Sequence, residues 1–193
     1  GIAELLDKIE AIYRALPRDK RPRSLAMTVS TAVFIPKPHT PFQWCGQVDL
    51  ETIQRRQQIL RNHFRNRPVK YQWHDAKTSY LEAVLALGDR RLGPVIQSAW
   101  QRGRTFDAWD DHFDLDVWLS CLQEAGLDPD FYARRNRAAD EILPWSHIDC
   151  GVSETFLRDE YERALAGQTT PECRLACSAC GAASFGGGIC FDR

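Results

Sequence analysis

An apolar, β-branched run that ends in closely spaced prolines constrains the fold of this chain more than any other feature. Residues 28–44 have the sequence TVSTAVFIPKPHTPFQW, and the first half predicts a buried strand. Pro36 lacks the N–H group that a sheet ladder needs, so the strand is expected to end near Ile35. Residues that precede proline favour extended geometry, so the next segment is predicted to be a stiff loop. Polar groups at such a strand end predict a ligand site.

Helix and strand patterns alternate around this loop. The patterns predict a helix over 1–16, a strand over 25–35, a helix from Asp49 to about residue 66, and a strand over 69–73. Long connections between the strands imply parallel pairing, with helices packed outside. Two parallel strands cannot by themselves form a sheet that is buried on both faces. We therefore expect further strands, from another chain or from a longer barrel.

The rest of the chain predicts a helical module and a tail. Ser79 and Glu82 have capping-box spacing, and N-caps are expected at Asp114, Asp128 and Ser153. The tail is rich in glycine and poor in core residues, so either something other than hydrophobic burial orders it or it is disordered. The predicted fold is therefore α/β: βα units over 1–76, a helical module over 77–167 and a Cys-rich tail over 168–193.

Composition excludes several classes of protein. The chain has 193 residues, 44% hydrophobic and 26% charged, which is typical of a soluble globular protein. The net charge of −1 gives no strong signal for nucleic-acid binding, and no apolar run approaches the roughly 20 residues of a membrane span. Seven cysteines without a secretory signal predict a reducing, cytoplasmic compartment. The start at Gly1 suggests a truncated chain.

Three cysteines in the tail have the spacing of a metal site. Cys173, Cys177 and Cys180 form a C-x3-C-x2-C pattern, and Cys190 is the candidate fourth ligand. Thiolates at this spacing suit either a [4Fe-4S] cluster or tetrahedral zinc, and free or redox-active thiols are the remaining alternative. The remaining cysteines are isolated in sequence. Cys121 is expected in the core, Cys45 in a structural position, and Cys150 at a tight turn before a glycine.

The pair His74-Asp75 follows the second predicted strand. These residues predict an acid–base pair, or alternatively a helix-capping Asp75 beside a hydrogen-bonded histidine. Right-handed crossovers place the ends of both strands on one side, so this pair and the proline loop are expected at one mouth. His147 and Asp149 lie two residues apart and are expected to face the same way.

Long strings in this chain resemble a family of radical S-adenosylmethionine (SAM) proteins. These strings are FIPKPHTPFQW, YQWHDAKTSYLEAVLALGDRRLGPVIQSAW, FDAWDDHFDLDVW, LPWSHIDCGVSETFLRDEYERALAG and TPECRLACSAC. Members of the family often carry a cobalamin-binding domain ahead of the radical SAM barrel. The resemblance covers most of this chain but only the C-terminal part of such a protein. The cobalamin domain and the first half of the barrel, with its cluster motif, are absent.

The resemblance implies a partial (β/α) barrel that depends on the rest of the barrel upstream. The implied activity is reductive cleavage of SAM at a [4Fe-4S] cluster, with radical chemistry on an unknown substrate. The isolated chain is expected to be inactive, and cobalamin is a further expected cofactor of the whole protein. Val33 and Ile35 would line the adenine, while Lys37, His39 and Thr40 would meet polar ligand groups. The tail cysteines would form an additional site, although family tails place the fourth cysteine nearer the third. The alternative is a non-catalytic zinc-binding or protein-interaction module.

Overall fold

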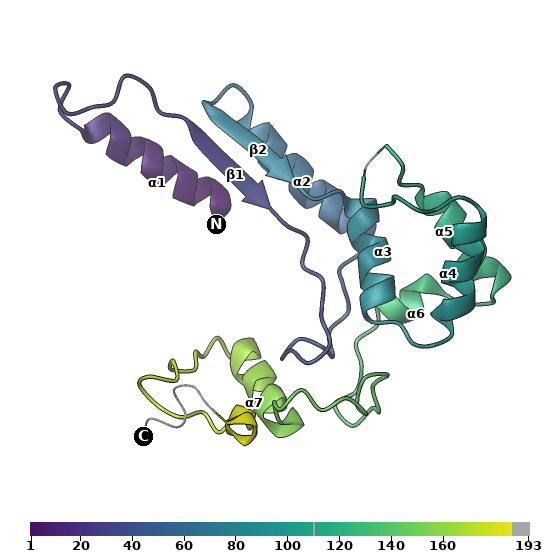
Figure 1. The fold of residues 1–193 in the computed structure, drawn as a ribbon. Helices are drawn as coiled ribbons and strands as arrows, with labels where there is room; N and C mark the ends of the chain where they lie inside the picture. The colour runs from purple at the N-terminus through teal and green to yellow at the C-terminus, as the bar shows by residue number, and fades with distance from the viewer. Residues whose placement is uncertain (110, 187–193) are drawn as a thin grey trace. The chain divides into compact units, whose positions relative to one another are not determined.

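The structure, a computed structural model, describes residues 1–109 and 111–186. The chain divides into two compact units, whose helices and strands are labelled in Figure 1. Unit 1 combines Gly1–Phe34 with Val48–Ser79, and unit 2 combines Ile35–Gln47 with the chain from Tyr80 onward. The proline loop therefore belongs to unit 2, while the strand before it belongs to unit 1. The domain limits predicted at residues 76 and 167 stay predictions.

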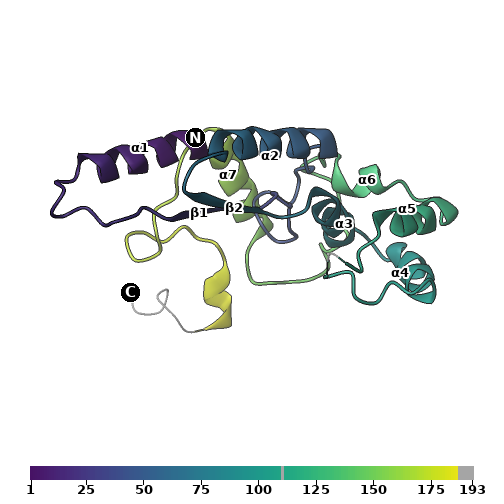
Figure 2. The same ribbon diagram turned by 90° about the horizontal axis from the view of Figure 1, so that it is seen from above.

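Unit 1 is a pair of parallel strands with two helices. Its elements are α1 (Ile2–Ala15), β1 (Met27–Thr31), α2 (Leu50–Phe64) and β2 (Val69–Trp73). The strands pair in parallel from Met27 opposite Val69 to Thr31 opposite Trp73, which confirms the predicted pairing. Asp49 accepts a hydrogen bond from the backbone N–H of Thr52 and so forms the predicted N-cap of α2. Figure 2 shows α1 and α2 together on one side of the two strands.

The first strand differs from its prediction in length and in burial. It ends at Thr31, four residues before Ile35, because β2 ends opposite Thr31 and leaves the later residues without a ladder partner. Its residues alternate between half-buried and exposed, so the strand is not buried as predicted. The half-buried set faces the helices: Tyr71 of β2 packs edge-on against Phe64 of α2, with ring centroids 5.3 Å apart.

Unit 2 is helical. Its elements are α4 (Leu92–Gln101), α5 (Leu115–Glu124), α6 (Pro129–Ala133), α7 (Glu154–Leu165) and a 3-10 turn, η1 (Ala182–Phe185), and α3 (Ala76–Ala86) enters it from unit 1. Asp114, Asp128 and Ser153 cap α5, α6 and α7 as predicted. The capping box predicted at Ser79 is wrong, because the helix already begins at Ala76 and the Ser79 hydroxyl donates to the Asp75 carbonyl.

The proline loop is part of the core of unit 2. Trp44 is buried together with Leu87, Leu143, Trp145 and Leu157. The Trp44 carbonyl accepts a hydrogen bond of 2.8 Å from the backbone N–H of Arg137. Buried contacts of this kind hold the loop, and residues 38–44 form turns rather than the extended geometry predicted for residues before proline. Within the part of the chain that the structure describes, no helix is long and apolar enough to cross a membrane.

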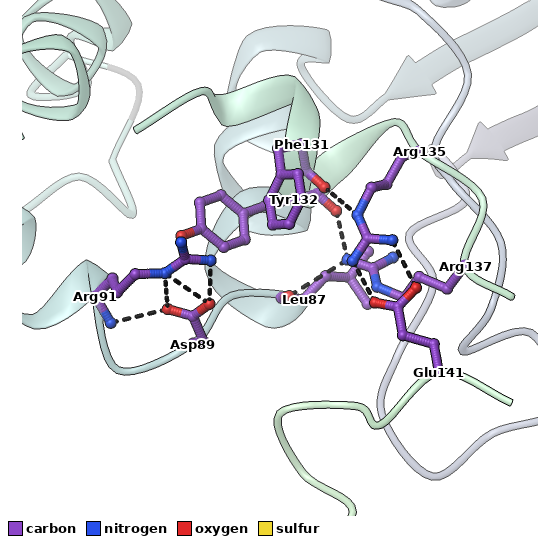
Figure 3. A network of polar contacts seen from close by, with 8 residues as sticks. All are labelled: Leu87, Asp89, Arg91, Phe131, Tyr132, Arg135, Arg137 and Glu141. Atoms are coloured by element: carbon purple, nitrogen blue, oxygen red, sulfur yellow. Dashed lines mark hydrogen bonds and ion pairs between the residues drawn. The ribbon is translucent and has the colours of Figure 1, made fainter. Parts of the chain in front are cut away.

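Arg137 is the most deeply buried cation of unit 2 that the structure describes. It is 6% exposed, and its Nη2 donates to the Tyr132 carbonyl at 2.7 Å and, more weakly, to the Leu87 carbonyl at 3.4 Å (Figure 3). Burial lowers the pKa of this guanidinium, because a charged group loses hydration there. The side chain thus joins the end of α3 to the end of α6, beside the segment that holds Trp44.

The neighbouring ion pair of Arg135 and Glu141 should make unit 2 sensitive to acid. The hydrogen bond from Arg135 holds the pKa of Glu141 below its usual range (Figure 3). A carboxyl group with a lowered folded-state pKa stabilises the fold above its unfolded pKa, and this contribution is lost as the pH falls through the folded pKa. Both side chains keep some contact with solvent, so the contribution is about 0.5–1 kcal/mol.

We therefore expect Glu141→Gln to lower the free energy of unfolding at pH 7, and the difference from wild type to disappear as the pH falls from about 5 towards 3. Urea unfolding at several pH values measures this. Glu162→Gln, on the exposed face of α7, is the matched control. A difference that persists unchanged at pH 3 would contradict the assignment.

Candidate functional site

The ends of β1 and β2 bring part of the predicted site together in unit 1. The His74 backbone N–H donates to the Thr31 carbonyl at 3.2 Å, so the residue after β2 lies beside the end of β1. The His74 carbonyl accepts from Gln57 of α2 at 2.9 Å, and its side chain is exposed. Val33 follows two residues after β1 and is half-buried. The acid–base role predicted for His74 stays a prediction.

Asp75 has a structural task. One of its carboxylate oxygens accepts hydrogen bonds from the backbone N–H of Thr78 at 2.8 Å and from the Thr78 hydroxyl at 3.2 Å. This is the N-cap interaction of α3, which confirms the capping alternative proposed from the sequence. A carboxylate held in this way satisfies a helix N-terminus, so any acid–base work by Asp75 would compete with the cap.

A row of polar side chains on the sheet was missed by the sequence analysis. Thr28 lies opposite Lys70, and Ser30 lies opposite Gln72, on the face of the strand pair that the helices leave open. All four residues are exposed within this chain. Two hydroxyls, an ammonium and an amide therefore share one face. The signal was present in the sequence, because Thr28 and Ser30 alternate with Met27, Val29 and Thr31 at the period of a strand.

The loop residues predicted to bind cofactor lie in unit 2 and do not act as one group. Lys37 pairs with Glu82 of α3, with Nζ 2.5 Å from Oε1, and the Thr40 hydroxyl donates to the Lys37 carbonyl at 2.7 Å. Ile35 is half-buried at the start of this unit. His74 and Asp75 belong to unit 1, so the predicted common mouth stays a prediction.

His39 is held in an unusual conformation. Its φ of +56° lies in the left-handed region, which is strained for a residue with a Cβ atom. Its backbone N–H donates to Gln43 Oε1 at 3.0 Å, and the same oxygen accepts from Trp145 Nε1 at 2.7 Å. Gln43 is 3% exposed, so this doubly bonded amide fixes the loop from inside the core.

The His39 side chain borders a cavity of about 310 Å³ in unit 2. His147, Asp149 and Ser153 line the same cavity. The structure thus brings His39 together with the His147–Asp149 pair, a hundred residues further along the chain. Sequence analysis noted that His147 and Asp149 share a direction, but nothing in the sequence joined them to the proline loop. Imidazole and carboxylate groups around one cavity suit a polar ligand.

The tail cysteines adopt a turn that suits metal binding. The Ala179 backbone N–H donates to Cys177 Sγ at 3.4 Å, and Ala179 has a φ of +53°. Gly181, which follows Cys180, has a φ of +97°. Hydrogen bonds from backbone N–H groups to sulfur are typical of metal–thiolate centres. The positive φ of Ala179 directs its N–H group at the Cys177 sulfur, and strained backbone of this kind is often found at ligand sites.

The tail thiols are accessible in this structure. Cys173 and Cys177 are exposed, and Cys180 is half-buried. Among the described residues, no three His, Cys, Asp or Glu side chains are gathered closely enough to hold a metal ion. Cys190 lies outside the described residues. Sites of this type rarely exist before the metal binds, because binding and local folding are coupled.

The other three cysteines lie in the kinds of position that the sequence predicted. Cys121 is 1% exposed in the core around α5, which confirms its prediction. Cys45 Sγ donates to the Tyr161 hydroxyl at 3.6 Å, and this interaction raises the pKa of Tyr161. Cys150 is half-buried and precedes Gly151, whose φ of +75° confirms the predicted tight turn.

Comparisons with models of protein families, with curated proteins and with solved structures found no match to this chain. The radical SAM resemblance therefore depends on the strings quoted above. A function can be proposed from that resemblance together with the geometry of the strand pair and of the tail.

Proposed function

We propose that this chain forms the C-terminal part of a radical SAM enzyme and carries an additional metal centre in its tail. The observation that carries the proposal is the open polar face of β1 and β2. A [4Fe-4S] cluster held by residues upstream of this chain would supply the electron for reductive cleavage of SAM. Cobalamin is a further proposed cofactor of the whole protein, and the substrate is unknown.

The geometry of unit 1 supports a place in a barrel wall. In a (β/α) barrel, parallel strands carry helices on the outer face and present alternate side chains to the interior. β1 and β2 have this arrangement, with α1 and α2 on one face and Thr28, Ser30, Lys70 and Gln72 on the other. A hydroxyl-, amine- and amide-lined interior suits SAM, which carries a carboxylate, an ammonium group and ribose hydroxyls.

Apolar side chains on α1 also support a larger assembly of helices. Four of them are exposed by 41–66% within this chain: Ile2, Leu5, Ile9 and Ile12. Soluble proteins rarely leave such a stripe open unless another surface covers it. Outer helices of a barrel pack against the helices on both sides, and a preceding βα unit would cover this stripe.

The loop residues differ in how readily their side chains could contact a ligand. His39 borders a cavity, whereas Lys37 must leave Glu82 before it can meet a ligand, and the Thr40 hydroxyl is occupied by a backbone carbonyl. We therefore place His39 first among the proposed polar contacts. Val33 and Ile35 keep their proposed positions beside the adenine.

The test is the production of 5′-deoxyadenosine under anaerobic, reducing conditions. The isolated chain should form none, and a protein that carries this chain together with the preceding barrel should form it. In that longer protein, Gln72→Leu removes a hydrogen-bonding group from the open face and should lower the rate about tenfold. Gln54→Leu, on the exposed face of α2, is the matched control and should leave the rate unchanged.

Two outcomes would contradict the proposal. Turnover by the isolated chain would make the tail cysteines the catalytic cluster site. Equal rates for Gln72→Leu, Gln54→Leu and wild type would remove the open face from the ligand site.

The turn at Cys177–Cys180 also favours a second candidate function. The same N–H···S geometry serves zinc and iron–sulfur centres equally, so a non-catalytic zinc or protein-interaction module remains the alternative. Metal analysis separates the two. A brown protein that contains iron and acid-labile sulfide supports the enzyme, and a colourless protein with zinc alone supports the module.

A further inference from the structure

We propose that Cys150, rather than Cys190, is the fourth thiolate of the tail metal centre. The other three ligands are Cys173, Cys177 and Cys180. This inference rests on the tail metal centre proposed above and holds for either metal. It assigns a ligand to the turn before α7, where the sequence analysis predicted only a tight turn.

A direct contact joins the tail to that turn. The Ser153 backbone N–H donates to the Cys180 carbonyl at 2.8 Å. One residue further on, a Cβ atom at Gly181 would lie only 3.0 Å from the Gly151 carbonyl oxygen. The two segments therefore touch through their backbones. Gly181 also needs its positive φ of +97°, so both the space and the backbone conformation require glycine at this point.

The turn that carries Cys150 is anchored from several directions. Gly151 is buried, and its N–H donates to Asp149 Oδ1 at 2.7 Å. Ser153 Oγ accepts from the Phe156 N–H and so fixes the start of α7, while Leu157 of that helix lies in the core. Cys150 therefore extends from a fixed scaffold, whereas the other three thiols lie on a segment with few core contacts. A rigid ligand of this kind would position the tail when metal binds.

The backbone contact sets the gap that shared ligation must close. Backbones of adjacent extended segments lie about 5 Å apart. Two thiolates on one zinc ion have sulfur atoms at most about 4.6 Å apart, because each metal–sulfur bond is about 2.3 Å long. In a [4Fe-4S] cluster each thiolate binds a different iron, so the sulfur atoms need not come so close. Cys150 and Cys180 each lie one residue before the contact of Gly151 with Gly181. Ligation would therefore require side-chain rotation and a shift of the tail to bring the sulfurs to one zinc ion or one cluster, and each thiol would release its proton to solvent on binding.

Cys190 is the weaker candidate on entropic grounds. It follows Cys180 by ten residues that include the glycines at 186, 187 and 188. Closing a glycine-rich loop of that length costs more conformational entropy than using a residue that the fold already holds beside the site. Cys150 requires no such closure, because the hydrogen bond from Ser153 to Cys180 already brings the two segments together.

The first experiment measures iron, zinc and sulfide per chain in anaerobically purified variants. Cys150→Ser should lose metal to the same extent as Cys173→Ser, Cys177→Ser and Cys180→Ser. Cys190→Ser should keep it. Cys121→Ser, in the core, is the control and should also keep it. Circular dichroism of Cys150→Ser checks that α7 is retained.

A second experiment separates ligation from a purely structural effect of Cys150. Cobalt(II) added to the metal-free chain gives sulfur-to-metal charge-transfer absorption that grows with the number of thiolates bound. Cys150→His supplies a nitrogen ligand instead, so cobalt should still bind while this absorption falls by about one quarter. A residue that only supports the turn would leave the absorption per bound cobalt unchanged.

The outcomes distinguish this inference from the proposal beneath it. Retention of metal by Cys150→Ser, with loss by Cys190→Ser, overturns the assignment of Cys150 and keeps the tail centre. Retention of metal by Cys173→Ser, Cys177→Ser and Cys180→Ser removes the tail centre itself. Loss in Cys150→Ser with unchanged absorption per cobalt in Cys150→His overturns the ligand role.

Discussion

Removal of the tail metal should make the peptide bond after Arg174 at least about tenfold more sensitive to trypsin. Arg174 is exposed and lies between Cys173 and Cys177. Leu175 beside it is 74% exposed, so hydrophobic burial does little to order this segment. In the proposed centre, metal ligation would supply the free energy that holds this segment. Timed digestion with and without chelator, analysed by mass spectrometry, measures the ratio.

The control sites for this digestion lie in α7. Arg158 belongs to a helix whose Leu157 is buried in the core, so cleavage after Arg158 should be slow with or without metal. Adding metal back should restore protection at Arg174. Equal cleavage after Arg174 in the metal-bound and metal-free proteins would show that the tail is not ordered by ligation.

Local signals in the sequence predicted most elements well. The caps at Asp49, Asp114 and Ser153 were confirmed, because the capping interaction involves residues only two or three positions apart. The strand at 69–73 was confirmed with its bounds and its parallel partner. The mixed α/β class was therefore visible in the sequence, while the structure neither supplies nor excludes the further strands of a barrel.

Two predictions failed because a stronger competitor lay nearby. Ser79 and Glu82 have capping-box spacing, but Asp75 lies earlier and caps the helix first. The strand over 25–35 was predicted to be buried because of its apolar content. The polar residues Thr28 and Ser30 occupy alternate positions of this strand, and they leave one of its faces exposed. In both cases the pattern was present in the sequence, but residues next to it determined the structure: Asp75 for the helix start, and the alternating polar residues for the burial of the strand.

The candidate sites show where sequence reasoning ends. The spacing of Cys173, Cys177 and Cys180 predicted a metal site in the tail, which stays a prediction, and it gave no information about Cys150. That residue is relevant only because the backbone of Ser153 meets the tail, which is a contact between segments far apart in sequence. In the same way, His39 and His147 share a cavity that no local pattern could predict.

Gly46→Ala should destabilise unit 2 by about 3 kcal/mol or more. A Cβ atom at this position would lie 2.0 Å from the backbone carbonyl oxygen of Arg134. No side-chain rotation relieves that overlap, because the obstructing atom belongs to the backbone. The segments are also tied together by hydrogen bonds from Gly46 to Asn136 Oδ1 at 2.9 Å and from Gln47 to the Ala133 carbonyl at 2.7 Å. Separating them would break both bonds.

The consequence reaches the site, because Gly46 closes the loop that carries His39 and Gln43. We expect thermal unfolding, followed by tryptophan fluorescence, to shift down by about 10 °C. Gly93→Ala is the matched control: nothing lies within 4 Å of its added Cβ, and alanine should stabilise α4 by up to about 1 kcal/mol. If Gly46→Ala melts at the wild-type temperature, the loop does not pack against Arg134, and the fixed position of His39 that the proposed site requires is lost with it.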